Sequence, residues 1–458
     1  MEHSGKGMAR RYAVETFGCQ MNAHDSERLG GLLQQAGYAR ARSAEEADLI
    51  VVNTCSVREK AAEKLFARLD RFRRRPREER PLVAVTGCVA QQEGARIVDR
   101  APMVDVVIGT QALAMLPQAI DEAERTGRPQ VDTNPYDNVS FPLGVAIRED
   151  PVKAYVTVIE GCNDFCSFCV VPYTRGHERM RPVAEIVAEV SAAAAAGHRE
   201  VHLLGQIVNH YQAPDAPECD FAGLLDRVHA VDGIDRIRFA SPHPRHVTGR
   251  MIQAIRDLPK VCKHLHLPVQ SGSTRMLARM RRRHTRERYL ALIEEMRAQV
   301  TGVTLSTDMI VGFPGETPQD FEETLSLTET VRYHGMFSFK YSERPNTLAR
   351  ARMPDDVPES EKARRLTILQ ALQQRIQQEL HDSMIGRTVT VLADAASRRR
   401  AGEYAGRTSG NTVVNFPGDS TCVGRLVDVR IERAGPNSLW GTLPPTLERR
   451  PGGGDGVV

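Results

Sequence analysis

Three closely spaced cysteines lie near the middle of the chain, at Cys162, Cys166 and Cys169. They form a CxxxCxxC pattern directly after a run of strand-forming residues that ends at Glu160. Three thiolates on one short loop can bind three irons of a 4Fe-4S cube and leave the fourth iron without a protein ligand. Catalysis at a metal requires such an open position, whereas a structural zinc site is normally closed by four protein ligands. The spacing therefore favours a catalytic iron-sulfur cluster over a structural zinc ion.

A second group of cysteines is spread over the first part of the chain. Cys19, Cys55 and Cys88 each follow a run of strand-forming residues. Because the carboxyl ends of parallel strands meet at one edge of a sheet, we expect these three thiols to converge and to hold a second cluster. The alternative for each is a small buried hydrophobic residue. The remaining cysteines lack such neighbours and are interpreted as ordinary thiols: Cys219, Cys262 and Cys422.

The elements that must position these cysteines divide the chain into three folded parts of an α/β protein. Short β-branched runs alternate with helical stretches over 10–126, which predicts a parallel α/β sheet domain. Residues 127–147 contain several prolines and little periodicity, so we interpret them as a linker. Six strand-and-helix units over 148–381 predict a partial or complete (β/α) barrel. Short strands over 383–447 predict a small β-barrel, and the glycine-rich residues 448–458 predict a disordered tail.

Two further strand ends of the predicted barrel could hold a cofactor, because the sites of such barrels gather at the carboxyl ends of strands. The candidates are Gly205, Gln206, Gly312 and Glu316. Glycine lets a backbone approach a ligand closely, although a tight turn explains it equally well. His264 and His266 alternate along the fourth strand, and we interpret them as structural histidines outside the site.

Composition limits the class of protein. With 41% hydrophobic and 26% charged residues over 458 positions, the chain has the composition of a folded multidomain protein. The formal net charge of +3 is only mildly basic, but runs at Arg73–Arg75, Arg281–Arg283 and Arg398–Arg400 could contact phosphates or lie in solvated loops. Neither a signal peptide nor a long apolar run is present, so we expect a cytoplasmic protein that uses cysteines for metals rather than disulfides.

Several motifs together resemble a known family. CxxxCxxC with Phe168 before the last cysteine resembles the signature of the radical S-adenosylmethionine superfamily. Longer runs look like the methylthiotransferases of that superfamily, and the resemblance extends from about Arg10 to about Thr446. These runs are Gly18–Asn22 (GCQMN), Asn53–Cys55 (NTC), Gly87–Cys88 (GC), Cys169–Gly176 (CVVPYTRG), His266–Ser273 (HLPVQSGS) and Phe337–Ser342 (FSFKYS).

The resemblance implies a fold, cofactors and ligands. The central part would be a partial radical S-adenosylmethionine barrel, and the last part a TRAM-like β-barrel that binds RNA, with Arg398–Arg400 facing phosphate. Two 4Fe-4S clusters and S-adenosylmethionine would be bound. One cluster would lie on Cys162, Cys166 and Cys169, and an auxiliary cluster on Cys19, Cys55 and Cys88.

The resemblance also implies an activity and partners. A methylthio group would be inserted at C2 of N6-dimethylallyladenosine next to the anticodon of tRNA, with sulfur from the auxiliary cluster. A radical is needed because the C2 hydrogen is not acidic enough for a general base to remove. The implied partners are the tRNA anticodon stem-loop, a low-potential electron donor of the flavodoxin or ferredoxin type, and a donor of sulfur or clusters.

Two alternatives to this function stay open. The same chemistry could act on a ribosomal-protein aspartate or on threonylcarbamoyl adenosine, although the run Val170–Thr174 favours the dimethylallyl class. The chain could instead be an RNA-binding protein with zinc in its cysteine loops. Ile207 stands where the family commonly has Asn, and Asn346 where Gly is usual. These two departures concern substrate contacts rather than cluster ligands.

Overall fold

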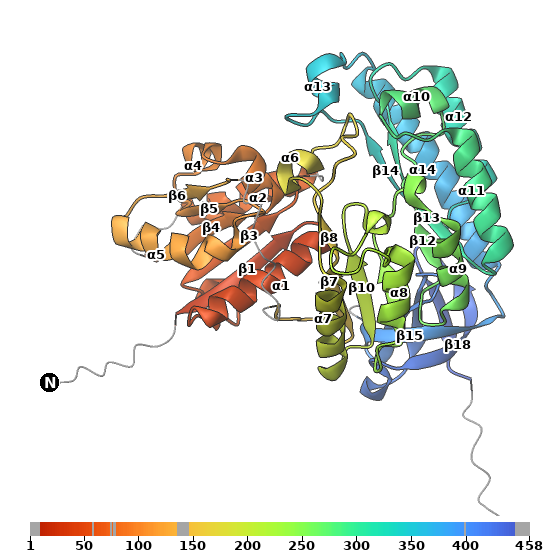
Figure 1. Cartoon of the computed structure of the whole chain (residues 1–458), viewed down its shortest axis with the longest axis horizontal. Coiled ribbons are helices and arrows are strands. Elements are labelled where there is room, and N and C mark those ends of the chain that lie inside the picture. The colour runs from red at the N-terminus through yellow and green to blue at the C-terminus, as the bar shows by residue number, and fades with distance from the viewer. Residues whose placement is uncertain are drawn as a thin grey trace, which may run out of the picture.

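The computed structural model describes residues 10–56, 59–73, 76, 79–134, 146–397 and 400–444. An N-terminal α/β domain, a central barrel and a small C-terminal β-barrel follow one another along the chain, which confirms the predicted fold class (Figure 1). The predicted tail over 448–458 lies outside the described residues, as do Arg398, Arg399 and residues 135–145 of the predicted linker.

The N-terminal domain is built on six parallel strands in the order β2-β1-β3-β4-β5-β6. They are β1 (Arg11–Phe17), β2 (Ala39–Arg40), β3 (Leu49–Thr54), β4 (Leu82–Thr86), β5 (Val106–Ile108) and β6 (Gln130–Asp132). β3 is buried along its whole length, as expected for a strand covered on both faces. β6 lies within the predicted linker over 127–147, so the sheet extends further along the chain than predicted. Its sequence, QVD, contains one apolar residue and therefore gave no strand pattern.

Helices cover both faces of this sheet. They are α1 (Gln20–Gln35), α2 (Glu59–Arg73), α3 (Cys88–Glu93), α4 (Arg96–Arg100) and α5 (Leu116–Thr126). Leu29 and Leu33 of α1 share one buried cluster with Ile120 of α5. Leu65 and Leu69 of α2 belong to the cluster on the opposite face. Burial of these apolar stripes holds the three layers together.

Six parallel strands form the wall of the central barrel, as two sheets with the orders β11-β10-β7 and β12-β13-β14. They are β7 (Lys153–Thr157), β10 (Glu200–Leu204), β11 (Arg236–Phe239), β12 (His264–His266), β13 (Thr304–Val311) and β14 (Gly335–Lys340). A parallel bridge between Ile237 and Val261 connects the two sheets. β7 and β14 do not pair within the described part of the chain, so the barrel is partial.

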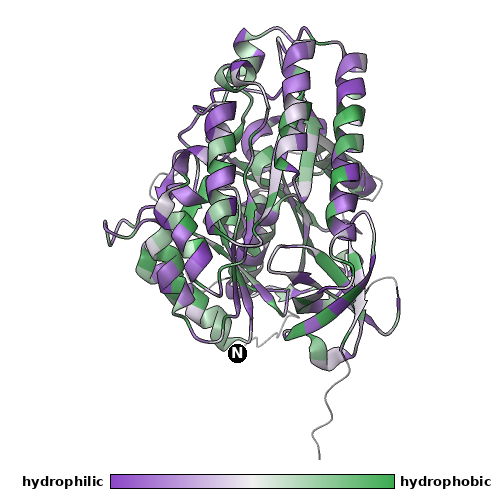
Figure 2. Cartoon of the chain, turned by 90° about the vertical axis from the view of Figure 1, so that its right-hand side faces the viewer, coloured by the Kyte–Doolittle hydropathy of each residue, from purple (hydrophilic) through white to green (hydrophobic). Residues whose placement is uncertain are grey.

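Amphipathic helices enclose this wall. The longer ones are α7 (Val183–Ala195), α8 (Phe221–His229), α9 (Gly249–Asp257), α11 (Arg286–Gln299), α12 (Pro318–Val331) and α14 (Glu359–Asp382). Figure 2 shows hydrophilic and hydrophobic bands along the outer helices, the pattern expected when one face packs on strands. Shorter elements complete the loops: β8 (Ile159–Glu160), α6 (Val171–Arg175), β9 (Arg179–Met180), α10 (Thr274–Arg279) and α13 (Leu348–Arg352). No helix among the described residues has the length and apolar character to span a membrane.

The C-terminal part is a closed barrel in the order β15-β16-β17-β19-β18. Its strands are β15 (Thr388–Ala396), β16 (Glu403–Thr408), β17 (Val413–Pro417), β18 (Leu426–Ala434) and β19 (Leu439–Thr442). Val391, Val414, Phe416 and Val429 fill its core. Closure leaves no unpaired strand edge, which stabilises a domain with so small a core.

The C-terminal barrel packs against the amino ends of the central strands, below the central barrel in Figure 1. Arg238 of β11 donates to the Thr408 carbonyl at 2.7 Å and bonds to the buried Glu200 carboxylate at 2.9 Å. Thr304, the first residue of β13, donates to the Gly410 carbonyl at 2.8 Å. The C-terminal barrel therefore lies at the opposite end from the carboxyl ends of the strands.

Replacing Arg238 tests this interface. Arg238→Leu would leave Glu200 buried without its guanidinium partner, so we expect a loss of about 3–5 kcal/mol in the free energy of unfolding. Trp440, the single tryptophan of the chain, lies on β19 and reports unfolding in urea by its fluorescence. Arg256→Leu, at an exposed pair with Asp257, is the matched control and should change little. Equal stability of both variants would contradict the role given to Arg238.

Candidate active site

The CxxxCxxC loop connects β8 to α6 at the carboxyl end of the first barrel strand. Gly161 precedes the loop with φ of 80°, and a Cβ there would lie 2.0 Å from the His177 carbonyl oxygen, so only glycine fits. The Cys162 amide donates to the Gly176 carbonyl at 3.1 Å, which closes the loop on itself. The loop therefore presents its thiols where the sites of such barrels gather.

The three thiols of this loop influence one another's charge. Burial raises the pKa of Cys162 and of Cys169 to about 12, and the charge of Cys166 contributes to both shifts. A cationic iron-sulfur core would supply the positive charge that three such thiolates need, so the donor set fits a cluster. Among the described residues, no three His, Cys, Asp or Glu side chains lie close enough to share one metal ion. A 4Fe-4S cube instead binds each thiolate through a different iron.

Arg282 contacts this loop and was not predicted as part of the site. It is 6% exposed, and its Nη1 donates to Cys166 Sγ at 3.5 Å while its Nη2 donates to the Pro268 carbonyl at 2.6 Å. Its neighbours Arg281 and Arg283 have φ of 57° and 56°, a left-handed conformation that is costly for arginine. This strain places Arg282 inside while Arg281 and Arg283 stay exposed. The arginine run is the sequence signal for it, but the run by itself predicts only a phosphate contact or a solvated loop.

Cys19, Cys55 and Cys88 meet at one edge of the N-terminal sheet, as their positions at strand ends predicted. Cys19 is the N-cap of α1, Cys55 follows β3, and Cys88 begins α3. A hydrogen bond from the Cys55 thiol lowers the pKa of Cys19 to about 5, and the charge of Arg175 lowers it further against the effect of burial. Gly87 has φ of 89°, and a Cβ there would lie 2.3 Å from Asn53 Oδ1, so the chain needs glycine before Cys88.

Arg175 connects the two cysteine groups. It is the last residue of α6, the helix that directly follows Cys169, and its Nη2 bonds to Asp25 of α1 at 2.6 Å. Both side chains are buried, with exposed fractions of 4% and 1%. Burial lowers the pKa of Arg175, but the charges of Asp25 and Cys88 outweigh it and raise that pKa. Figure 1 shows α6 between the N-terminal domain and the barrel. Sequence reasoning missed this residue because its partner lies far away in the chain.

The predicted cofactor residues after β10 lie beside the cysteine loop. A Cβ on Gly205 would lie 2.2 Å from Ile159 Cγ2, so close packing of protein explains this glycine. Gln206 Oε1 is buried and has no hydrogen-bond partner within the described residues. A buried acceptor of this kind is a group that a bound ligand can satisfy.

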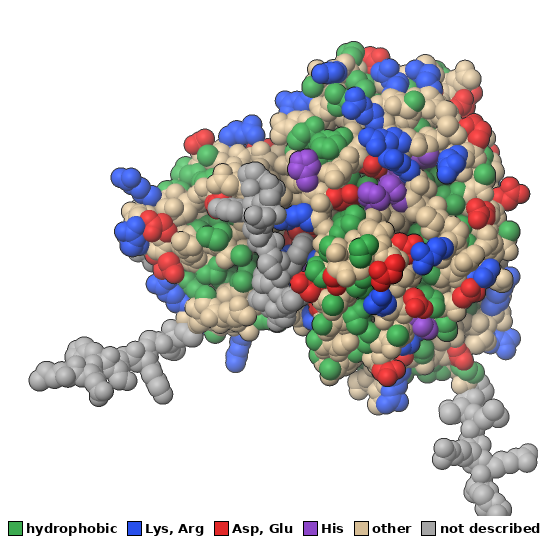
Figure 3. Space-filling view, viewed as in Figure 1, with side chains coloured by type: hydrophobic (Ala, Val, Ile, Leu, Met, Phe, Trp, Pro, Cys, Tyr) green, Lys and Arg blue, Asp and Glu red, His purple; other side chains and the backbone are tan. Residues whose placement is uncertain are grey.

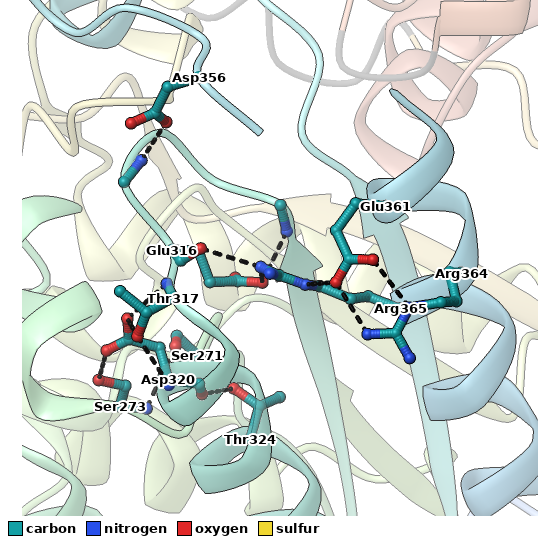
Figure 4. Close-up of polar contacts among 12 residues, drawn as sticks. Ser271, Ser273, Glu316, Thr317, Asp320, Thr324, Asp356, Glu361, Arg364 and Arg365 are labelled. Atoms are coloured by element: carbon teal, nitrogen blue, oxygen red, sulfur yellow. Dashed lines mark hydrogen bonds and ion pairs between the residues drawn. The ribbon is translucent and has the colours of Figure 1, made fainter. Parts of the chain in front are cut away.

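The predicted cofactor residues after β13 are held by protein contacts (Figure 4). Glu316 accepts from the Gly312 amide at 3.0 Å and pairs with Arg365 of α14 at 2.6 Å. Its carboxylate thus fixes the loop, and its predicted contact with a cofactor stays a prediction. Gly312 has φ of 69° and packs on Lys362, which accounts for glycine there.

The motif at His266–Ser273 connects neighbouring loops of the barrel. Ser273 caps α10 and donates to Asp320 at 2.6 Å, and Figure 4 shows Thr317 beside them. His266 bonds to Ser306 at 2.8 Å, and His264 bonds to the same hydroxyl at 3.0 Å. Both histidines therefore have structural partners, in line with their interpretation from the sequence.

A cavity of about 580 Å³ lies at the other end of the barrel, between Arg199 and Arg425.

Three family models match the chain. They are described as "Uncharacterized protein family UPF0004" over residues 11–109, "Radical SAM superfamily" over 156–328 and "TRAM domain" over 382–443. Among solved structures, the radical S-adenosylmethionine methyltransferase TsrM from Kitasatospora setae, with tryptophan and a cofactor analogue bound, gives a TM-score of 0.56 at 14% identity. That match covers 85% of this chain and 79% of the other, and it shows a shared fold.

Curated relatives are similar over almost their whole length. The tRNA-2-methylthio-N(6)-dimethylallyladenosine synthase of Geobacter metallireducens is 46% identical, over 94% of this chain and 97% of that protein. The enzyme of the same name from Halorhodospira halophila is 48% identical, over 95% and 93%. With the radical S-adenosylmethionine and TRAM matches, this likeness shows that the chain belongs to the tRNA-2-methylthio-N(6)-dimethylallyladenosine synthase family of methylthiotransferases.

Proposed function

We propose that this chain inserts a methylthio group at C2 of N6-dimethylallyladenosine next to the anticodon of tRNA. Curated relatives at 46% and 48% identity carry the name of this reaction. The observation that carries the proposal is the pairing of two cysteine groups across one interface, linked by Arg175. Overall, a C–H bond of the adenine becomes a C–SCH3 bond.

The chain is a radical S-adenosylmethionine enzyme, with a 4Fe-4S cluster and S-adenosylmethionine as cofactors. Cys162, Cys166 and Cys169 are the residues that would hold this cluster. When bound, the cluster and S-adenosylmethionine supply the 5′-deoxyadenosyl radical that removes hydrogen from C2. Arg282 orients Cys166 through its bond to Sγ. Gln206 would offer its unpaired Oε1 to S-adenosylmethionine, close to the packed glycine Gly205.

An auxiliary 4Fe-4S cluster on Cys19, Cys55 and Cys88 would supply the sulfur. The low pKa of Cys19 favours its thiolate, the form that binds iron. Arg175 adds positive charge beside Cys19 and Cys88, which offsets the charge of three thiolates. The position of Arg175 and the low pKa of Cys19 thus favour a metal site over three ordinary buried thiols.

The substrate defines the partners and the compartment. The tRNA anticodon stem-loop is the substrate. The TRAM match over residues 382–443 supports this, because a TRAM domain is a type of domain that binds RNA. A low-potential electron donor of the flavodoxin or ferredoxin type would reduce the first cluster, and a sulfur or cluster donor would renew the second. Because tRNA is modified and used in the cytoplasm, we propose a cytoplasmic location.

Reconstitution tests the reaction directly. The full chain, loaded anaerobically with iron and sulfide and supplied with S-adenosylmethionine and a reductant, should convert a prenylated anticodon stem-loop to the 2-methylthio product. Mass spectrometry of the digested RNA measures the product. Modification of a threonylcarbamoyl-adenosine stem-loop instead, with the prenylated RNA unchanged, would reject the proposed substrate.

Single cysteine replacements should separate the two clusters. Cys166→Ala should abolish cleavage of S-adenosylmethionine because the radical-generating cluster loses a ligand. Cys55→Ala should retain cleavage but stop methylthio insertion. Iron analysis should fall from about eight to about four per chain in Cys55→Ala. Cys422→Ala, on the C-terminal barrel, is the control and should match the parent chain. Cleavage that survives in Cys166→Ala would exclude the assigned role of the CxxxCxxC loop.

Thiol alkylation of the metal-free chain should follow the pKa differences. Cys19 is exposed and has a pKa of about 5, so it is a thiolate at pH 7 and its reactivity falls only as the pH drops through 5. Cys162 and Cys169, with pKa values of about 12, stay protonated at pH 7. Iodoacetamide labelling followed by peptide mass spectrometry should therefore find Cys19 modified first. Equal labelling of Cys19, Cys162 and Cys169 would contradict the pKa difference between them.

Arg282 should raise the midpoint potential of the cluster on Cys162, Cys166 and Cys169. Arg282→Gln removes a positive charge beside Cys166, which destabilises the more negative reduced form, so the midpoint potential should become more negative. A redox titration monitored by electron paramagnetic resonance measures the shift, and Arg282→Lys should restore part of it. Arg288→Gln, an exposed position on α11, is the control. An unchanged midpoint potential in Arg282→Gln would show that the charge of Arg282 does not act on the cluster.

A further inference from the structure

Five ring side chains lie in two neighbouring groups at the mouth of the barrel, which together we call the ring belt: Tyr173, Phe165 and His177, then His210 and His246. Phe165 meets Tyr173 edge-on at 6.3 Å and His177 at 6.4 Å between ring centres. His210 and His246 stack at 4.2 Å with their planes 31° apart. Glu178, next to His177 in the chain, bonds to His210 at 2.9 Å and joins the two halves of the belt.

The ring belt borders the proposed radical-generating cluster. Phe165 lies between Cys162 and Cys166, and it has φ of 47°, a left-handed conformation that is strained for an aromatic residue. Phe165 is 37% exposed and Tyr173 is 44% exposed, although apolar rings of this size are usually buried. Strain and exposure together keep aromatic surface open beside the cysteine loop.

Positive charge surrounds the ring belt. Asp164 is 10% exposed and draws in Arg245 at 3.4 Å and Arg283 at 3.8 Å, both of which remain largely exposed. Beneath the belt, the buried His243 has no hydrogen-bond partner for Nε2 within the described residues. Figure 3 shows purple histidine side chains beside blue basic and red acidic ones on one face of the molecule.

We propose that the ring belt binds unpaired bases of the RNA loop that carries the target adenosine. This inference rests on the proposed function and adds where the substrate is held. Proteins recognise single-stranded RNA mainly by stacking bases on aromatic, histidine and arginine side chains, with basic groups on the phosphates. The ring belt supplies rings for stacking, and Arg245 and Arg283 beside it supply positive charge. Both lie next to the cluster that the target base must reach.

The ring geometry favours RNA over an acidic electron-donor protein. Each edge-on contact covers one face of one ring only, and Phe165 and Tyr173 stay partly exposed, so a flat base can lie on the remaining ring surface. Burial lowers the pKa of His246 to about 4, so this ring is neutral at pH 7 and stacks without charge. Phe165 and Tyr173 carry no charge, so they would add little to the docking of an acidic protein, which depends on charge.

Binding of a labelled prenylated anticodon stem-loop to the reconstituted full chain tests the proposal. Tyr173→Leu and Phe165→Leu should each raise Kd about five- to a hundredfold, the range measured for loss of one stacked base. The dependence of Kd on salt should keep its slope in both variants, because no charge is lost. Arg245→Gln should instead reduce that slope. His229→Leu, at the end of α8 and outside the belt, is the matched control.

The outcomes separate the inference from the proposed function. Iron content and the visible spectrum establish that each variant still holds its clusters. A Kd within twofold of the parent chain for both ring variants would overturn the inference, and so would normal RNA binding with slower reduction by a flavodoxin. If the parent chain binds the RNA but forms no methylthio product, the proposed function is wrong. The inference about the ring belt is then tested only by comparing the Kd of the ring variants with that of the parent chain.

Discussion

The arrangement of the two cysteine groups depends on one buried ion pair. Arg175 ends the helix that directly follows Cys169, and Asp25 lies on the helix that begins at Cys19, so their 2.6 Å contact fixes one group relative to the other. Both charges are buried, and removal of Asp25 would take from Arg175 its 2.6 Å carboxylate partner, at a cost of about 3–5 kcal/mol. The N-terminal domain is therefore held on the barrel in one orientation, with both sets of thiols at the shared interface.

The same interface gives the two groups different electrostatic environments. Around Cys19, a hydrogen bond from Cys55 and the charge of Arg175 favour the thiolate. In the CxxxCxxC loop, burial raises the pKa of Cys162 and of Cys169 to about 12, and Arg282 donates to Cys166. This difference supports the proposal that the two groups hold clusters with different tasks.

The arginine run at Arg281–Arg283 shows how one sequence pattern can serve two purposes. Left-handed backbone at Arg281 and Arg283 turns the middle residue toward Cys166 and leaves its neighbours in solvent. Arg283 then joins the positive rim around Asp164, beside the ring belt. In a helix the three successive side chains would fan out around the axis, and such a run lies on the surface more often than against a buried thiol.

The sequence by itself determined the architecture and the grouping of the cysteines. Strand-forming runs with a cysteine at each carboxyl end are enough to bring Cys19, Cys55 and Cys88 together, because parallel strands end at one edge. Only the tertiary structure decided the contacts of Arg175, Arg282 and Glu316. The bond of the Glu316 carboxylate to Arg365 of a distant helix is one such contact. Such partners depend on how separate domains and helices pack together. The local pattern of the sequence cannot predict them, because these residues are far apart in the chain and meet only in the folded protein.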